Sequence, residues 1–410
     1  MGSLLKISWR NIWRNRRRTL INMSAAGFGL LLIIVLSGLT AGLLADGKRQ
    51  LGNTGMGHVE IYAPGWRLKH NAGQTLANPA ALLASLPLPP GAQAGARVVA
   101  RGLATSAHGG QGVEIHGVDP AIEPRLAHYA ADIRQGAPLA ADDLHGVLIG
   151  EELAKRLQLR VGLKVRLMAQ RADGEVGADL YRVRGIFHAI SPNLSRGIVL
   201  VTAASAQTLL GLGDVAHQIV VQLPRPEDAD AVAAQLRASL GGNYDIVTYG
   251  DLLPMLKTME VMYRDVMLFI ALFVYVLAGL GILNTMLMSV LERTREFGVM
   301  RALGNRPRYV VALVLAEAFW IGTISAAAGL ALGLLVTWLG SEQPLMDFTK
   351  LYGESFEIGG IVVKSAFRTE FSPLAALRAS AVVYLLTLTV GLYPAWRVSR
   401  MRPAEAIRAD

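Results

Sequence analysis

Four long apolar blocks constrain this chain more than any other feature of its sequence. The chain has 410 residues, of which 52% are hydrophobic and 17% charged, and the shortage of charge is concentrated in these blocks. A soluble domain carries about 25% charged residues. About 20 apolar residues in a helix cross the roughly 30 Å hydrocarbon core of a bilayer. The blocks therefore predict four transmembrane helices, at residues 20–44, 266–291, 309–339 and 379–396.

One carboxylate lies inside an apolar block. Glu317 follows the start of the third block. A carboxylate exposed to lipid is costly, and ionisable residues in spans therefore face protein or lie near the interface. We expect one of these two positions for Glu317.

Small residues recur in the second and third blocks. They allow close helix approach, and they are Gly279, Gly281, Ser289, Gly322, Ala326, Ala327, Gly329 and Gly333. Two interpretations stay open, since such residues serve packing within one subunit or a seam between two subunits.

Basic residues gather on one side of the predicted membrane. They precede the first span, separate the second from the third and follow the fourth: Lys6, Arg10, Arg14, Arg16, Arg17 and Arg18, then Arg293, Arg295, Arg301, Arg306 and Arg308, then Arg397, Arg400, Arg402 and Arg408. The positive-inside rule makes this side the cytoplasm. Residues 1–19, 292–308 and 397–410 are thus predicted to be cytoplasmic. Residues 45–265 and the loop 340–378 are predicted to be extracytoplasmic. This clustering accounts for the net charge of +9, and we expect no nucleic-acid partner.

The N-terminal segment 1–19 mixes bulky apolar and basic residues. Lys6, Arg10 and Arg14 interleave with apolar side chains, namely Leu4, Ile7, Trp9, Ile12 and Trp13. This pattern predicts a short interfacial helix on the inner leaflet, with its Trp rings buried and its cations at lipid phosphates. A plain topology signal is the alternative interpretation, and the two are compatible.

The segment 45–265 has the mixed character of a folded domain. Alternating strand and helix patterns predict an α/β core. Strands are expected at 57–62, 97–103, 113–118, 147–149, 163–168, 180–187, 197–201, 218–223 and 244–247. Helices are expected at 80–85, 151–157, 203–210, 226–240 and 251–263. The predicted fold class is an α-helical membrane protein with four transmembrane helices and a large mixed α/β extracytoplasmic domain between spans one and two.

Several classes of chemistry have no support in the sequence. There are no cysteines, which excludes disulfides, thiolate metal sites and a cysteine nucleophile. The eight histidines match no metal-ligand motif, and there is no GxSxG or GxxxxGK[ST] sequence. We therefore assign no catalytic, metal or cofactor-binding residue. The chain is not expected to be an enzyme by itself, and energy for any transport has to come from another protein.

The most informative segment follows the second span. A short amphipathic helix is expected there, ending at Gly304, with Pro307 opening the next helix. An apolar knob is expected from Phe297, Met300, Ala302 and Leu303, and a polar rim from Glu292, Arg293, Arg295, Glu296 and Arg301. Such a knob needs a groove on another protein or the inner leaflet. The alternative is an interfacial turn that touches only lipid.

This segment resembles the hallmark of the FtsX-like permeases, the group that holds the macrolide-export (MacB-type) and lipoprotein-sorting permeases of ABC transporters. The matching positions are Asn284, Glu292, Arg293, Glu296, Gly298, Arg301, Ala302, Gly304 and Glu317. The C-terminal stretches Tyr393–Arg397 and Arg402–Arg408 resemble the closing motif of the same family. The resemblance extends to the layout of one span, a large outer domain and three further spans.

The resemblance implies a mechanism. Family members dimerise, as homo- or heterodimers, and dock a coupling helix on a cytosolic ABC ATPase dimer. ATP and Mg are bound by that ATPase, and its closure is passed to the outer domains, which is called mechanotransmission. For this chain the coupling residues implied are Glu292, Arg293, Glu296, Phe297, Gly298, Met300, Arg301, Ala302, Leu303 and Gly304.

The resemblance also implies a place and a cargo. The place is the bacterial cytoplasmic (inner) membrane, with both termini cytoplasmic and the large domain periplasmic. The cargo implied is a lipoprotein, lipid or other envelope amphiphile, with a periplasmic carrier or lipoprotein as a further partner. Three alternatives stay open: an exporter of small molecules or peptides, a regulatory protein that controls a cell-wall hydrolase or senses a peptide, and a membrane-anchored binding module without an ATPase.

Overall fold

The computed structural model describes residues 2–189, 191–352, 355–358 and 361–400. The chain divides into two compact units. The first unit contains Met1–Ala45, Glu260–Phe348 and Ala366–Asp410, and the second contains Asp46–Met259 and Thr349–Ser365.

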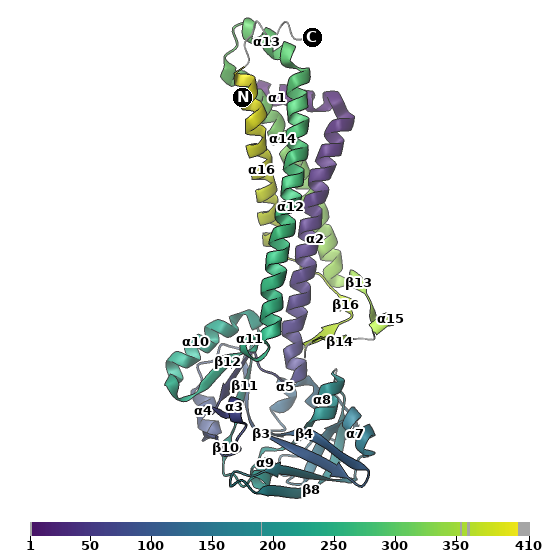
Figure 1. Cartoon of the computed structure of the whole chain (residues 1–410), viewed down its shortest axis with the longest axis vertical. Coiled ribbons are helices and arrows are strands. Elements are labelled where there is room, and N and C mark those ends of the chain that lie inside the picture. The colour runs from purple at the N-terminus through teal and green to yellow at the C-terminus, as the bar shows by residue number, and fades with distance from the viewer. Residues whose placement is uncertain (1, 190, 353–354, 359–360, 401–410) are drawn as a thin grey trace. The chain divides into compact units, whose positions relative to one another are not determined.

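Long helices dominate the first unit (Figure 1). In chain order the helical elements are α1 (Gly2–Ile12), η1 (Trp13–Asn15), α2 (Arg16–Thr54), α12 (Pro254–Glu292), α13 (Thr294–Ala302), α14 (Pro307–Glu342) and α16 (Pro373–Ser399). Among the described residues, four segments are long and apolar enough to cross a membrane: Thr19–Leu51, Pro254–Glu292, Pro307–Glu342 and Pro373–Ser399. Each contains one of the four predicted spans. Helices α2 and α12 have 39 residues each, or about 58 Å, so they exceed the thickness of a bilayer core.

Glycines let α14 pack closely against its neighbours. A Cβ atom at Gly329 would lie 2.5 Å from the carbonyl oxygen of Gly27 in α2. A Cβ at Gly322 would lie 3.1 Å from a methyl of Thr387 in α16. Gly322 and Gly329 therefore serve packing within this chain. At Gly281, by contrast, an added Cβ would meet nothing within 4 Å.

We expect Gly329→Ala to destabilise the protein by about 1–3 kcal/mol, because the new methyl group forces α14 away from α2. The apparent melting temperature of the purified protein in detergent measures this loss. Gly281→Ala is the matched control, and it should leave the melting temperature unchanged or slightly raised, since alanine favours a helix over glycine. Equal melting temperatures for the two variants would contradict the close contact between α2 and α14.

A ten-stranded sheet forms the second unit. Its strand order is β12-β1-β11-β3-β4-β9-β6-β8-β5, and β7 pairs with β3 and β8. The pairs β4–β9 and β6–β8 are parallel, and the other pairs are antiparallel. The strands are β1 (Val59–Tyr62), β3 (Gln93–Ser106), β4 (Gly109–Val118), β5 (Ile133–Gly136), β6 (Gly146–Gly150), β7 (Lys164–Gln170), β8 (Val176–Phe187), β9 (Ile198–Thr202), β11 (Gln218–Gln222) and β12 (Asp245–Thr248).

Smaller elements complete both units. Three two-stranded ribbons pair β2 (Leu76–Ala77) with β10 (Val215–Ala216), β13 (Met346–Asp347) with β16 (Ala366–Phe367), and β14 (Ser355–Ile358) with β15 (Ile361–Lys364). The remaining helices are α3 (Trp66–Lys69), α4 (Pro79–Ser85), α5 (Glu123–Leu126), α6 (His128–Ala131), α7 (Glu151–Leu157), α8 (Pro192–Gly197), α9 (Ala203–Leu210), η2 (Pro226–Asp228), α10 (Ala229–Leu240), η3 (Gly241–Asn243), α11 (Tyr249–Leu252) and α15 (Thr349–Tyr352).

The hydrophobic core of the second unit has two main parts. In one, Leu153 of α7 and Leu209 of α9 pack with Val165 and other strand residues. In the other, Leu82 of α4 and Val232 of α10 pack with residues of β1, β11 and β12. The apolar positions that alternate along the strands thus face helices, which is why this segment forms a folded domain.

Every strand predicted in this segment overlaps an observed one, but β2, β5 and β10 were not predicted, and two predicted segments differ in structure from expectation. The helix expected at 251–263 is divided, because α11 ends at Leu252 and the remainder belongs to α12, which runs without a break through 265. The segment 340–378 was expected to be a loop, but it contains short strands and a helix, and residues 349–365 belong to the second unit.

Candidate functional site

The predicted coupling segment forms the short helix α13. Helix α12 ends at Glu292, and Arg293 leaves helical geometry with φ −112° and ψ 14°. Helix α13 then runs from Thr294 to Ala302. Gly304 follows with φ +93°, a conformation that glycine adopts without strain. Pro307 begins α14, where its missing N–H costs nothing.

The prediction that Phe297 belongs to an apolar knob on the surface of α13 is wrong. Its side chain is only 2% exposed and belongs to a core cluster with Met286, Val314 and Ala395. Met300 packs against the same cluster. Phe297 and Met300 are three residues apart, so they share one face of the helix, and this face points into the protein.

A different apolar pair on α13 faces outward. Val299 is 43% exposed and Leu303, just after the helix, is 79% exposed. Being four residues apart, they share the opposite face. Arg295 and Ala302 are also exposed. The surface that another molecule can touch is therefore centred on Val299 and Leu303, with Arg295 beside them in sequence.

Arg293 was predicted to lie on the polar rim, but it is buried and ties α13 to α14. Its Nη1 donates a hydrogen bond of 2.6 Å to Oε1 of Glu317, and its Nε donates one of 3.1 Å to Oε2 of Glu296. The guanidinium also lies 5.0 Å from the ring centre of Phe297. Glu317 is buried in the same place, so of the two positions expected for it the structure shows the one that faces protein.

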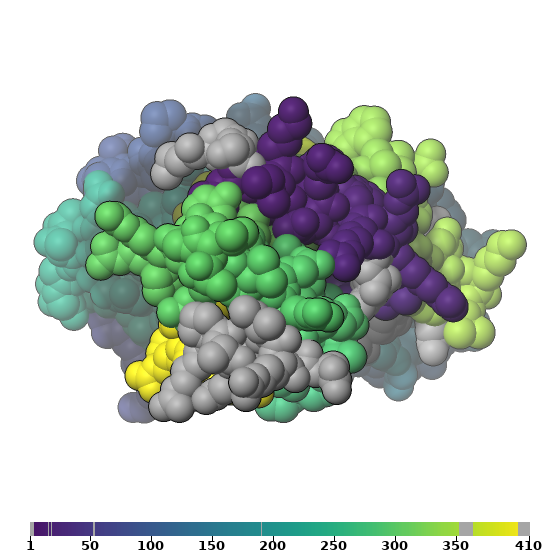
Figure 2. Space-filling view, turned by 90° about the horizontal axis from the view of Figure 1, so that it is seen from above, coloured from purple at the N-terminus to yellow at the C-terminus, as the bar shows by residue number. Residues whose placement is uncertain are grey.

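Two residues of the N-terminal segment complete this network. Asn11 of α1 donates a hydrogen bond of 3.0 Å to Oε1 of Glu317. Arg14 of η1 donates one of 2.5 Å to Oε1 of Glu296. This bond lowers the pKa of the Glu296 carboxyl and raises the pKa of the Arg14 guanidinium. Figure 2 views this end of the helices and shows the N-terminal segment (purple) beside the segment that contains α13 (green).

Sequence reasoning missed Asn11, and it expected Arg14 to lie at lipid phosphates or to act as a topology signal, not to pair with Glu296. One available signal was that the first acidic residue of the chain is Asp46. Any ion pair made by Arg14 therefore had to reach a distant segment.

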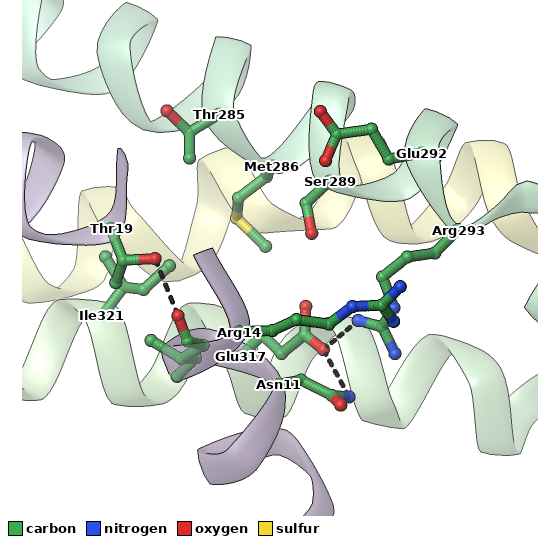
Figure 3. Close-up of a pocket in the computed structure, with 11 residues that line it drawn as sticks. Asn11, Arg14, Thr19, Thr285, Met286, Ser289, Glu292, Arg293, Glu317 and Ile321 are labelled. Atoms are coloured by element: carbon green, nitrogen blue, oxygen red, sulfur yellow. Dashed lines mark hydrogen bonds and ion pairs between the residues drawn. The ribbon is translucent and has the colours of Figure 1, made fainter. Parts of the chain in front are cut away.

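A polar pocket of about 220 Å³ lies beside this network (Figure 3). In the view, Asn11, Arg14 and Arg293 gather around Glu317. The pocket is lined by Asn11, Ile12, Arg14, Thr19, Thr285, Met286, Ser289, Glu292, Arg293, Glu317 and Ile321. This lining contains hydroxyl groups but no histidine, so it offers no pair of nucleophile and base of the usual kind. Its polar and charged groups instead join α1 and η1 to α13 and α14, through the bonds of Asn11, Arg14 and Arg293.

The histidines of the second unit take structural positions where they are buried. His217 accepts a hydrogen bond of 2.9 Å from the amide of Val99, and its other ring nitrogen lies 3.0 Å from the carbonyl oxygen of Ala72. Burial lowers the pKa of His217, which favours the neutral ring that these bonds require. Among the described residues, no group of three histidine, aspartate or glutamate side chains could hold a metal ion.

The C-terminal motif is described only in part. Tyr393–Arg397 lies within α16, where Ala395 joins the core cluster that contains Phe297. Arg402–Arg408 lies outside the described residues.

Two family models match the chain. Residues 19–239, more than half of the chain, match the MacB-like periplasmic core domain. Residues 268–403 match the C-terminal region of the FtsX-like permeases.

Named relatives match the chain over different lengths. A lipoprotein-releasing system transmembrane protein, LolC of Xylella fastidiosa, is 25% identical over 310 residues, which are 72% of this chain and 73% of that protein. The macrolide export ATP-binding/permease protein MacB of Escherichia coli K12 is 30% identical over 200 residues, which are 47% of this chain and 28% of that longer protein.

Solved structures resemble the chain over about half of its length. The periplasmic region of MacB from Actinobacillus actinomycetemcomitans aligns with a TM-score of 0.35 at 13% identity, covering 50% of this chain and 94% of that one. The extracellular domain of the ABC-type transporter YknZ from Gram-positive bacteria aligns with a TM-score of 0.33 at 16% identity, covering 46% and 99%.

Proposed function

Because the chain belongs to the ABC transporter permeases of the FtsX-like family, with a MacB-like periplasmic core domain, we propose that it is the membrane subunit of an ATP-driven machine. In this proposal α13 docks on a cytosolic ABC ATPase dimer, which binds ATP and Mg. Closure of the ATPase moves α13, and the spans pass this movement to the second unit on the other side of the membrane. The observation that carries the proposal is an exposed apolar pair on a helix that ion pairs anchor to the spans.

Anchoring matters because a docking helix transmits force only if it cannot turn on its own. Arg293 connects α13 to Glu317 inside α14, and Arg14 connects it to the N-terminal segment. Glu317 and Arg293 are both buried, so water competes little for the bond between them. A push on Val299 and Leu303 should therefore displace α14 and α1 together with α13.

The remaining parts of the proposal follow from topology and from the relatives. The positive-inside rule places both termini and α13 in the cytoplasm. The second unit then faces the periplasm, and a second permease subunit, identical or different, completes the dimer. The chain has no P-loop sequence for its own ATP site. The relatives named for lipoprotein release and macrolide export support an amphiphilic cargo, for which we propose a lipoprotein or lipid.

The docking surface is tested by co-purification with a cytosolic ABC ATPase that is co-expressed with this chain. We expect Val299→Asp with Leu303→Asp to weaken capture at least about a hundredfold, because each buried apolar side chain contributes about 1.5–3 kcal/mol. Leu68→Asp is the matched control. Leu68 is 88% exposed on α3 of the second unit, so its variant should capture the ATPase as the wild type does.

Two results would count against the proposal. If the wild type captures no ATPase, the chain is a membrane-anchored module rather than a transporter subunit. If the wild type and the double variant capture it equally, docking occurs elsewhere than on α13. Because Val299 and Leu303 are exposed, the double variant should keep its melting temperature, and this measurement shows that lost capture is not lost folding.

A further inference from the structure

A short segment between β16 and α16 joins two of the long helices. The amide of Glu370 donates a hydrogen bond of 2.8 Å to the carbonyl oxygen of Gly38 in α2. The amide of Thr369 donates one of 3.0 Å to the carbonyl oxygen of Gly340 in α14. We call Arg368–Glu370 the strap, because consecutive residues hold one helix each.

The side chain of Thr369 strengthens this connection. Its Oγ1 donates a hydrogen bond of 2.7 Å to the carbonyl oxygen of Thr337 in α14. Thr369 is only 4% exposed, and helical carbonyls have a second lone pair available for such bonds. Buried bonds of this kind are costly to break without replacement.

Three glycines make the slot in which the strap lies. A Cβ at Gly42 would lie 2.1 Å from the carbonyl oxygen of Arg368. A Cβ at Gly340 would lie 2.6 Å from Oγ1 of Thr369, and one at Gly38 would lie 3.2 Å from the carbonyl oxygen of Glu370. A side chain at Gly42 or Gly340 would therefore push the strap out, whereas one at Gly38 requires its neighbours to shift by only a few tenths of an ångström. The slot exists because Gly38 and Gly42 of α2 and Gly340 of α14 have no side chains.

The strap is held at its N-terminal side as well. Phe367, the residue before it, pairs with Met346 in the ribbon of β13 and β16. The carbonyl oxygen of Phe367 also accepts a hydrogen bond of 2.9 Å from the amide of Leu345. This ribbon follows α14 in the chain, so the strap cannot leave α14 without breaking the ribbon too.

We infer that the strap joins α2 and α14 into one rigid pair, with Thr369 as its positioning residue. The inference rests on the proposed function. Helix α14 receives the movement of α13 through Glu317, and α2 leads in the chain to the second unit. The strap makes both helices carry that movement together, and it stays closed throughout the ATP cycle. The opposite possibility, a gate that opens in each cycle, is an outcome of the test.

A disulfide tests whether the strap stays closed. A Cβ at position 38 would lie 3.6 Å from the Cβ of Thr369, within the range of about 3.5–4.5 Å that disulfides require. The chain has no cysteine, so Gly38→Cys with Thr369→Cys creates a single pair. The variant is studied in nanodiscs together with the co-expressed ABC ATPase. A pair of fluorescent unnatural amino acids at the exposed positions 68 and 332 reports movement of the second unit.

We expect the oxidised and reduced forms to show the same ATP-induced change in energy transfer, and ATP hydrolysis rates within about twofold. If oxidation abolishes the ATP-induced change in energy transfer and a reductant restores it, the strap has to open during the ATP cycle. That result would overturn the inference.

A second variant tests whether the strap transmits movement. Gly42→Val displaces it, and Gly281→Val is the matched control, because a Cβ there meets nothing within 4 Å. We expect Gly42→Val to keep ATPase capture and ATP hydrolysis, since α13 is unchanged, but to reduce the ATP-induced change at least about fivefold. If the ATP-induced change in energy transfer is as large in Gly42→Val as in the wild type, the inference is overturned.

The strap and the proposed function fail in different ways. If the wild type captures no ATPase, the proposed function is wrong, but this result does not test the strap. The strap is then measured in the full chain alone by amide hydrogen exchange. We expect the amides of 369 and 370 to exchange at least about tenfold more slowly in the wild type than in Gly42→Val, and equal exchange would overturn the strap itself.

Discussion

Replacing Glu317 with alanine is expected to lower the free energy of unfolding by about 3 kcal/mol, because it removes the buried carboxylate that pairs with Arg293 and leaves only the more exposed Glu296 as a counter-charge. Both partners are nearly inaccessible, and their hydrogen bond is 2.6 Å long. Asn11 loses its acceptor in the same variant. Denaturant titration in detergent measures the loss. Capture of the ATPase should fall as well, because α13 is no longer fixed to α14.

A matched control and a double variant make this expectation specific. Glu342→Ala removes an exposed carboxylate from the end of the same helix, and it should change stability by less than about 0.5 kcal/mol. Arg293→Met combined with Glu317→Leu removes both charges, and it should recover most of the stability. If the two single losses simply add in the double variant, Arg293 and Glu317 are not coupled and the anchoring of α13 is wrong.

The sequence predicted the spans because the signal for them is local. About 20 apolar residues are sufficient, and no distant segment has to be known. The N-terminal part of α12 was harder. It carries Lys257, Glu260, Arg264 and Asp265, so its charge hid the continuity with the apolar block.

Within the second unit, the strands were predictable but the sheet was not. Alternation of apolar residues marks a strand wherever one face is buried. Strand β5 was missed, because Ile133 is the single apolar residue of its four. Strand β1 pairs with both β11 and β12, far along the chain, and no local pattern encodes that choice.

The candidate site was predictable as a segment but not as a surface. The motif from Glu292 to Gly304 predicted the short helix. Helical spacing separates Phe297 from Val299, but it does not say which of them faces the protein. That depends on α14 and α16, which supply Val314 and Ala395 to the cluster around Phe297. The partner of Arg293 is likewise set by tertiary packing.

A second large effect on stability is expected at a buried ion pair in the second unit. Arg97 of β3 donates hydrogen bonds of 3.0 Å and 2.7 Å to the two carboxylate oxygens of Glu123 in α5. Its remaining nitrogen donates one of 2.6 Å to the carbonyl oxygen of Gly55. The side chains are 2% and 3% exposed. Arg97 thus holds together the sheet, α5 and the segment that follows α2.

Arg97→Met should therefore destabilise the second unit by about 3–5 kcal/mol, since the carboxylate of Glu123 stays buried without a counter-charge. Hydrogen exchange of the full chain resolves the effect by region. Amides of β3 and β11 should exchange faster, whereas those of α14 should not change.

Arg101→Met is the control on the same strand, because Arg101 is 67% exposed and pairs on the surface, where ion pairs contribute little. Glu123→Leu added to Arg97→Met should restore part of the protection by removing the unpaired charge. If the amides of β3 and β11 exchange at the same rate in Arg97→Met and in Arg101→Met, the buried pair contributes no more than a surface pair. The segment after α2 is then held by other contacts.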